Sequence, residues 1–108
     1  MILSPDDIDA VLKQVLTFST PDRVYLFGSN ATGHATARSD VDLLLIGRHD
    51  EPIHQRGKHV AAALRSFPAH FDILCYTARE LEEELADPLS FASTIIATGR
   101  LIYDRLGE

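Results

Sequence analysis

The sequence predicts a small α/β fold in which helices pack against one short β-sheet. Helix-like apolar repeats alternate with short β-rich runs, and the chain lacks the many repeats of a barrel. At 108 residues and 45% hydrophobic content, it has the size and composition of a folded chain with a single core. We therefore expect residues 1–108 to form one domain.

A helix is expected directly after the N-terminus. Ser4 is a favourable N-cap, Pro5 fits the first helical position, and Asp7 completes a capping-box-like pair. The following residues place one apolar stripe on this helix: Ile8, Val11, Leu12, Val15 and Leu16. A second helix is expected from residue 52 to about residue 67.

Two more helices are expected in the last third of the chain. Thr77 and Glu80 form another capping box, for a helix that ends near Asp87. Pro88 begins the next helix, which Gly99 closes. The apolar residues of this last helix are expected in the core, with an interface as the alternative for some of them: Phe91, Ile95 and Ile96.

Four short runs are typical of β-strands: residues 23–28, 41–47, 70–76 and 100–104. The third run contains Cys75, which is the single cysteine and cannot form an internal disulfide. Because its neighbours are apolar, we expect Cys75 to be a buried, reduced thiol.

Charge and hydropathy exclude several classes of protein. Ten Lys and Arg against sixteen Asp and Glu give a net charge of -6, so binding of a nucleic-acid backbone is not expected. No apolar stretch is long enough to span a bilayer. The N-terminal residues MILSPDDID lack the basic region of a signal peptide. We therefore expect a cytoplasmic protein that does not associate with membranes.

Two carboxylates stand at the start of the second expected strand. With a period of two, Asp40 and Asp42 lie on one face of this strand. As bare anions they repel each other, and partial burial makes each more costly. Magnesium would resolve this conflict, because it prefers carboxylate oxygens, water and phosphate. In the structural alternative, Asp40 caps the loop and Asp42 is a solvated edge residue.

The residues around these aspartates favour the functional interpretation. Gly28 and Ser29 end the preceding strand, and the loop after them is rich in Gly, Ala and Thr, which suits close approach to a phosphate. Asp72 lies in the next strand-like run and can join Asp40 and Asp42 if the two strands are neighbours. Three convergent carboxylates beside a phosphate loop indicate metal-assisted phosphoryl or nucleotidyl transfer.

Gly28-Ser29, then Asp40-Val41-Asp42 and a later Asp72, resembles the DNA polymerase beta-type nucleotidyltransferase superfamily. Over residues 5–103 the chain is similar to its minimal nucleotidyltransferases (MNT proteins), which are encoded beside HEPN toxins. The resemblance implies a mixed sheet flanked by helices, the α+β nucleotidyltransferase fold. It also implies that Gly28 and Ser29 hold the phosphates. Asp40, Asp42 and Asp72 would bind Mg²⁺ and act as catalytic residues, with Asp72 helping to deprotonate the attacking hydroxyl.

The loop also departs from the family pattern. Many MNT loops carry arginines where this chain has Thr32 and Thr36, which weakens the expectation of nucleotide affinity. Arg38 is a substitute nucleotide-binding residue, because a guanidinium makes paired contacts with phosphate. In the alternative interpretation, Arg38 neutralises the nearby carboxylates.

Two charged segments have simpler interpretations. The basic patch at residues 54–59 could reach a triphosphate, but a solvated helix face is the preferred interpretation. An acidic run is expected to face solvent or meet a basic partner: Glu80, Glu82, Glu83 and Glu84.

The resulting hypothesis is a magnesium-dependent enzyme that transfers AMP from ATP to a hydroxyl group. The resemblance implies an acceptor on a partner HEPN toxin, a tyrosine in the leading hypothesis, so that the chain acts as an antitoxin. A small-molecule acceptor is less favoured, because no second substrate-binding domain is evident. The alternative is a weakly active or inactive nucleotide-binding protein that neutralises its partner by contact alone. The sequence leaves a homo- or hetero-oligomer open.

Overall fold

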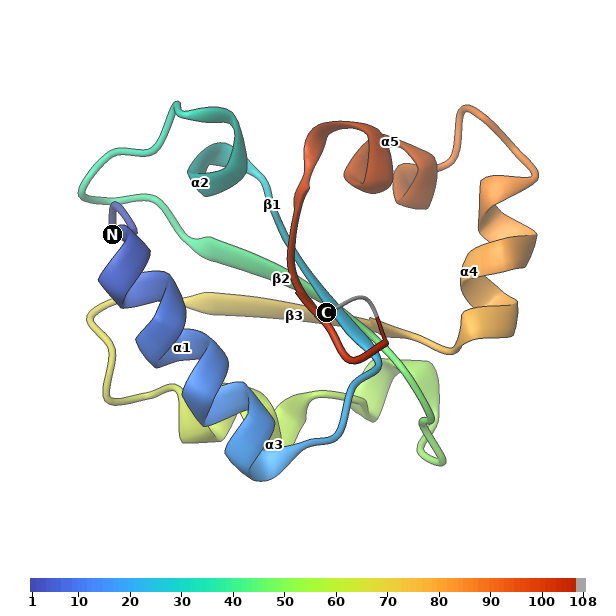
Figure 1. Ribbon diagram of the computed structural model, residues 1–108, viewed down its shortest axis with the longest axis horizontal. Coiled ribbons are helices and arrows are strands. Elements are labelled where there is room, and N and C mark those ends of the chain that lie inside the picture. Colours follow the sequence, from blue (N-terminus) through green and yellow to red (C-terminus); the bar gives the residue numbers. More distant parts are fainter. Residues whose placement is uncertain (107–108) are drawn as a thin grey trace.

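The computed structural model describes residues 1–106. The elements follow one another along the chain as α1 (Pro5–Phe18), β1 (Arg23–Phe27), α2 (Ser29–Thr32), β2 (Val41–Ile46), the 3-10 helix η1 (Ile53–Gln55), α3 (Lys58–Ala63), β3 (Phe71–Tyr76), α4 (Ala78–Leu85), α5 (Phe91–Thr98) and β4 (Arg100–Asp104). The predicted alternation of helices and strands is confirmed (Figure 1).

The four strands form one mixed sheet with the order β3-β2-β1-β4. β1 pairs antiparallel with both β2 and β4, whereas β2 and β3 pair in parallel. The parallel pair requires a crossover, and residues 47–70 provide it with η1 and α3. This α+β arrangement confirms the mixed sheet that the sequence resemblance implied.

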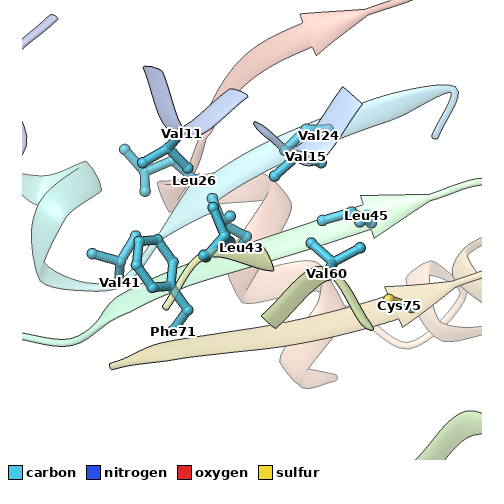
Figure 2. Close-up of a cluster of buried hydrophobic side chains, with 11 residues drawn as sticks. Val11, Val15, Val24, Leu26, Val41, Leu43, Leu45, Val60, Phe71 and Cys75 are labelled. Carbon is cyan, nitrogen blue, oxygen red and sulfur yellow. The ribbon is translucent and has the colours of Figure 1, made fainter. Parts of the chain in front are cut away.

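Helices cover both faces of the sheet. α1 and α3 pack on one face, and α4 and α5 pack on the other (Figure 1). β2 shows the two faces most clearly, since Val41, Leu43 and Leu45 join the α1–α3 core (Figure 2) while Leu44 and Ile46 join the α4–α5 core. Cys75 is a free, buried thiol, as predicted. Burial raises its pKa to about 11.

Both predicted capping boxes are present. In α1 the Ser4 hydroxyl accepts from the Asp7 N–H at 3.1 Å, and the Asp7 carboxylate accepts from the Ser4 N–H at 2.9 Å. In α4 the same reciprocal pair joins Thr77 and Glu80. Each box satisfies N–H groups that the first helical turn leaves without partners. Among the described residues, no helix combines the length and the apolar character needed to cross a membrane.

The helix predicted over residues 52–67 is wrong in its extent. Only Lys58–Ala63 is α-helical, and the short helix η1 precedes it. Gly57 separates the two with a φ of 80°, which an α-helix does not contain. A Cβ at Gly57 would lie 2.7 Å from Ile73 Cγ2, so the chain approaches β3 too closely here for any side chain.

The last predicted helix begins later than expected, at Phe91 instead of Pro88. Ser90 is the N-cap, and its hydroxyl accepts from the Ser93 N–H at 3.0 Å. A serine in this position satisfies an N–H group of the first turn, which a proline two residues earlier does not. The short helix α2, in the expected loop, is a further element that the sequence analysis did not predict.

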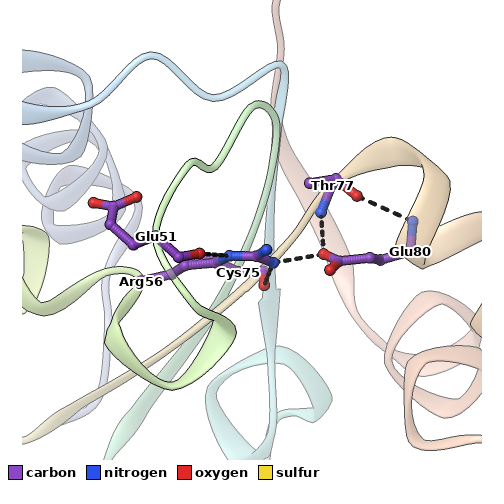
Figure 3. A network of polar contacts seen from close by, with 5 residues as sticks. All are labelled: Glu51, Arg56, Cys75, Thr77 and Glu80. Atoms are coloured by element: carbon purple, nitrogen blue, oxygen red, sulfur yellow. Dashed lines mark hydrogen bonds and ion pairs between the residues drawn. The ribbon is translucent and has the colours of Figure 1, made fainter.

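Part of the basic patch at residues 54–59 is structural and not solvated. The Arg56 side chain is 9% exposed and forms an ion pair with Glu80 at 2.5 Å (Figure 3). It also donates to the carbonyl oxygens of Glu51, at 2.9 Å, and Cys75, at 3.4 Å. The hydrogen bond from Arg56 and the backbone bond from Thr77 lower the pKa of Glu80 to about 2. Glu80 therefore departs from the expected solvent-facing acidic run and joins α4 to the crossover.

Candidate active site

The central feature of the candidate site is a pair of carboxylates on neighbouring strands. Asp42 is the second residue of β2, Asp72 is the second residue of β3, and the parallel register places them directly opposite each other. Phe27, at the end of β1, is the antiparallel partner of Asp42. Strand register thus unites two acids from distant parts of the sequence. Asp42 is half-buried, and the Asp72 side chain is 58% exposed.

The environment of Asp42 disfavours its negative charge. Burial raises the pKa of Asp42 to about 6, with further contributions from a hydrogen bond shared with Asp72 and from the charges of Asp72 and Asp40. The nearby His70 opposes this rise in pKa. His70 Nε2 lies 3.0 Å from Asp72 Oδ1. At neutral pH the two carboxylates repel each other, and a cation placed between them would relieve this repulsion.

Gly28 lies directly against this pair. Its φ of 75° is in the left-handed region, and a Cβ built at this position would overlap Asp42 Oδ2. Gly28 is also the N-cap of α2, and no side chain caps this helix end. The turn from Gly28 into Ser29 therefore brings uncapped backbone N–H groups next to the carboxylates, in an arrangement suited to a bound anion.

The loop that carries Asp40 is held by hydrogen bonds that were not predicted from the sequence. The Met1 ammonium donates to the carbonyl oxygens of Ala37, at 2.9 Å, and Ser39, at 2.8 Å. Asn30 Nδ2 donates to the carbonyl oxygens of Met1, at 3.0 Å, and Asp40, at 3.3 Å. These bonds join the N-terminal segment, α2 and the start of β2. The backbone of Asp40 is thereby positioned.

Two adjoining hollows open beside the carboxylates. One, of about 350 Å³, is lined by Asp42 and Asp72, and the other, of about 320 Å³, by Asp42, Gly28 and Thr32. Phe27 and Phe91 line both hollows. Their rings lie edge to face, with 5.9 Å between the ring centroids. Phe91 was predicted to lie in the core but is 60% exposed. Its ring forms an apolar wall that a nucleobase or acceptor side chain could contact.

The other predicted site residues lie at the periphery. Asp40 is exposed and precedes β2, yet its charge reaches Asp42. Arg38 is exposed, lines neither hollow and forms no ion pair with a described residue. Within residues 1–106, no three His, Cys, Asp or Glu side chains converge as a complete set of metal ligands. The donor chemistry of Asp42 and Asp72 nevertheless fits a hard divalent cation.

Comparison with known proteins agrees with this geometry. A family model described as polymerase beta, nucleotidyltransferase, matches residues 8–107. No curated protein matches the chain. A predicted nucleotidyltransferase from Sulfolobus solfataricus has a similar fold (TM-score 0.58, 20% identity, 89% of this chain and 76% of that chain covered). A toxin–antitoxin structure with AMP-PNP is also similar (TM-score 0.69, 16% identity, 91% and 73% covered). With its glycine turn beside two paired aspartates, and with the family model matched over almost its whole length, the chain belongs to the polymerase beta nucleotidyltransferase family.

Proposed function

We propose that this protein is a magnesium-dependent nucleotidyltransferase that transfers AMP from ATP to a tyrosine hydroxyl of a partner HEPN toxin. The modification would silence the toxin in the cytoplasm, so that the chain acts as an antitoxin of the MNT type. The observation that carries the proposal is the Asp42–Asp72 pair in direct register, in a chain of the nucleotidyltransferase family.

Asp40, Asp42 and Asp72 are the residues that would hold magnesium. When bound, the ion would offset the charge of the triphosphate and stabilise the pyrophosphate leaving group. Asp42 is desolvated and close to a second carboxylate, so a cation would offset a negative charge that is otherwise unfavourable there. Asp40 would complete the set by rotation of its exposed side chain.

Asp72 is the best-placed acceptor for the proton of the attacking hydroxyl. It is more exposed than Asp42 and lies on an edge strand, where an acceptor from solvent can reach it. The acceptor oxygen would bond to the α-phosphorus while the bond to the bridging oxygen of pyrophosphate breaks. The released proton would pass to the Asp72 carboxylate. His70, in contact with Asp72 Oδ1, would orient this carboxylate.

The nucleotide would lie along the Gly28–Ser29 turn. The backbone N–H groups of this turn would hold the phosphates, and the Ser29 hydroxyl would add a donor. Arg38 is proposed to swing in from the loop and contact the phosphate chain. The hollow between Phe27 and Phe91 would receive the base or the acceptor ring.

A toxin partner is supported by two observations. A similar structure is a toxin–antitoxin complex with AMP-PNP, an ATP analogue. The net charge of -6 suits a basic, RNA-cleaving partner. Assembly into a hetero-oligomer with this partner is part of the proposal.

Incubation with ATP, magnesium and the product of the neighbouring gene tests the proposal. Mass spectrometry should show one added AMP on a tyrosine of that product, and its ribonuclease activity should fall in parallel. Asp42→Asn and Asp72→Asn should each abolish the transfer. Asp9→Asn, the same chemical change on the exposed face of α1, should not. Transfer that persists in both Asp42→Asn and Asp72→Asn would refute the assigned site.

The alternative function is neutralisation by contact alone. It is favoured by the lack of a preformed set of three metal ligands among the described residues and by threonines at positions 32 and 36. An Asp40→Asn/Asp42→Asn double variant separates the two functions. If it silences the partner fully at equal concentration, with no added mass, the contact-only function is correct.

A further inference from the structure

A third hollow lies between α3 and the segment that enters β3. Its volume is about 400 Å³. The lining residues are Lys58, Ala61, Ala62, Leu64, Arg65, Ala69, His70 and Phe71. None of them lines the two hollows beside Asp42, so this is a separate cavity. We call it the α3 hollow.

The charge of the α3 hollow is opposite to that of the whole chain. Lys58 and Arg65 are both exposed, and the lining contains no Asp or Glu, although the chain carries a net charge of -6. Three arginines pair with carboxylates: Arg56 with Glu80, Arg79 with Glu83 and Arg105 with Asp22. Neither Lys58 nor Arg65 has a carboxylate partner among residues 1–106. These two charges are therefore available to an anion from solution.

Helical spacing explains the shape of the α3 hollow. Residues 58, 61, 62 and 65 are related by steps of three and four, so they share one face of α3 and its C-terminal turn. Ala61 and Ala62 are short and form a floor between the two long cations. Lys58 to Ala63 spans roughly 8 Å along the axis at 1.5 Å per residue, and Arg65 lies beyond that end. That span is longer than one phosphate group and suits an anion whose charge is spread along a chain.

We propose that the α3 hollow is a binding site for an oligophosphate anion, either free or as the phosphate chain of a nucleotide. Lys58 would bind one end of the chain as a point charge, and Arg65 would hold the other through paired guanidinium contacts. α3 packs on the sheet face opposite to α4 and α5, and His70 of the lining lies 3.0 Å from Asp72 Oδ1. The two cations that carry the site, Lys58 and Arg65, take no part in the proposed transferase reaction, whereas His70 of the lining contacts Asp72.

Titration with pyrophosphate in the absence of divalent metal tests the site. Without metal, the carboxylates repel phosphate, so binding at the α3 hollow is observed alone. We expect saturable shifts of the backbone amide signals of Ala61, Ala62 and Ala69 in NMR spectra. Lys58→Ala and Arg65→Ala should each raise the Kd about tenfold, as for loss of one charge-assisted contact. Arg79→Ala is the matched control, because it removes an equal charge from a side chain that is 90% exposed on α4.

The outcomes separate the possible ligands. Equal affinity for ADP and pyrophosphate would show that the phosphate chain alone is recognised, and tighter binding of ADP would identify a nucleotide ligand. Citrate binding as tight as pyrophosphate would refute selectivity for phosphate. The site is also refuted if pyrophosphate causes no saturable shift, or if Arg79→Ala weakens binding as much as Lys58→Ala does.

Discussion

Asp42→Asn should stabilise the protein when no metal is present. In the folded chain the pKa of Asp42 is raised from 3.8 to about 6, so the ionised carboxylate at pH 7 opposes folding. A shift of this size corresponds to at most about 3 kcal/mol at 1.36 kcal/mol per pKa unit. The unfavourable free energy is shared between Asp42 and Asp72, and Asp42 is only half-buried. We therefore expect Asp42→Asn to stabilise the fold by about 1–2 kcal/mol. Asparagine keeps the shape, removes the charge and can donate to Asp72.

The gain should depend on pH with a defined sign. A raised pKa means that the folded state binds a proton more tightly than the unfolded state. The contribution of Asp42 to stability therefore falls as pH rises from about 4 to about 6, and stays low above pH 6. The difference between Asp42→Asn and the unchanged protein should be small at pH 4 and fully developed at pH 7.

Thermal unfolding with a chelator measures this effect. At pH 7 the Tm of Asp42→Asn should exceed that of the unchanged protein by roughly 4 °C or more. Asp9→Asn, on the exposed face of α1, should leave the Tm nearly unchanged. Added magnesium should raise the Tm of the unchanged protein and not that of Asp42→Asn. An equal or lower Tm for Asp42→Asn at pH 7 would refute the claim that the paired carboxylates oppose folding.

Further predictions concern the glycine turn and the Arg56–Glu80 ion pair. Gly28→Ala should destabilise the fold by about 2 kcal/mol or more in urea unfolding, since it adds overlap with Asp42 to a positive φ. Gly33 also has a positive φ, but no atom lies within 4 Å of a Cβ built there, so Gly33→Ala should cost only about 1 kcal/mol. Equal losses of stability in Gly28→Ala and Gly33→Ala would contradict the role of the overlap with Asp42. Glu80→Gln should lower stability at pH 7 by about 1–2 kcal/mol, discounted for a side chain that is 36% exposed. Because the pKa of Glu80 is depressed to about 2, this loss should fade as pH falls from 4.5 toward 2, and a loss that is constant with pH would exclude the charge of Glu80 as its cause.

The features that the sequence predicted well depend on local chemistry. A cap and its partner three residues later are a local pattern, so both capping boxes were predicted correctly. The alternation of buried faces in β2 also follows directly from the order of its residues. The placement of Asp42 beside Asp72 required the further expectation that their two strands are neighbours, which the family resemblance implied.

The features that were missed depend on contacts between distant segments. Gly57 interrupts the expected helix, and the chain there lies close to Ile73, which belongs to another element. Asn30 joins Met1 and Asp40 across three segments, and no local pattern encodes such a contact. Phe91 is a large apolar residue of the type that is usually buried in a core. It nevertheless lies exposed at the hollows beside Asp42.

The parallel pairing of β2 and β3 also has a consequence for the rate of folding. Residues 47–70 must close as a loop before Asp42 meets Asp72, so their repulsion arises only when this pairing forms. The stabilisation by Asp42→Asn will divide between the refolding and unfolding rates according to how much pairing exists at the barrier. Faster refolding would show that the two strands meet before the rate-limiting step is complete. Slower unfolding alone would show that they meet afterwards, so the two acids of the candidate active site also report when the sheet closes.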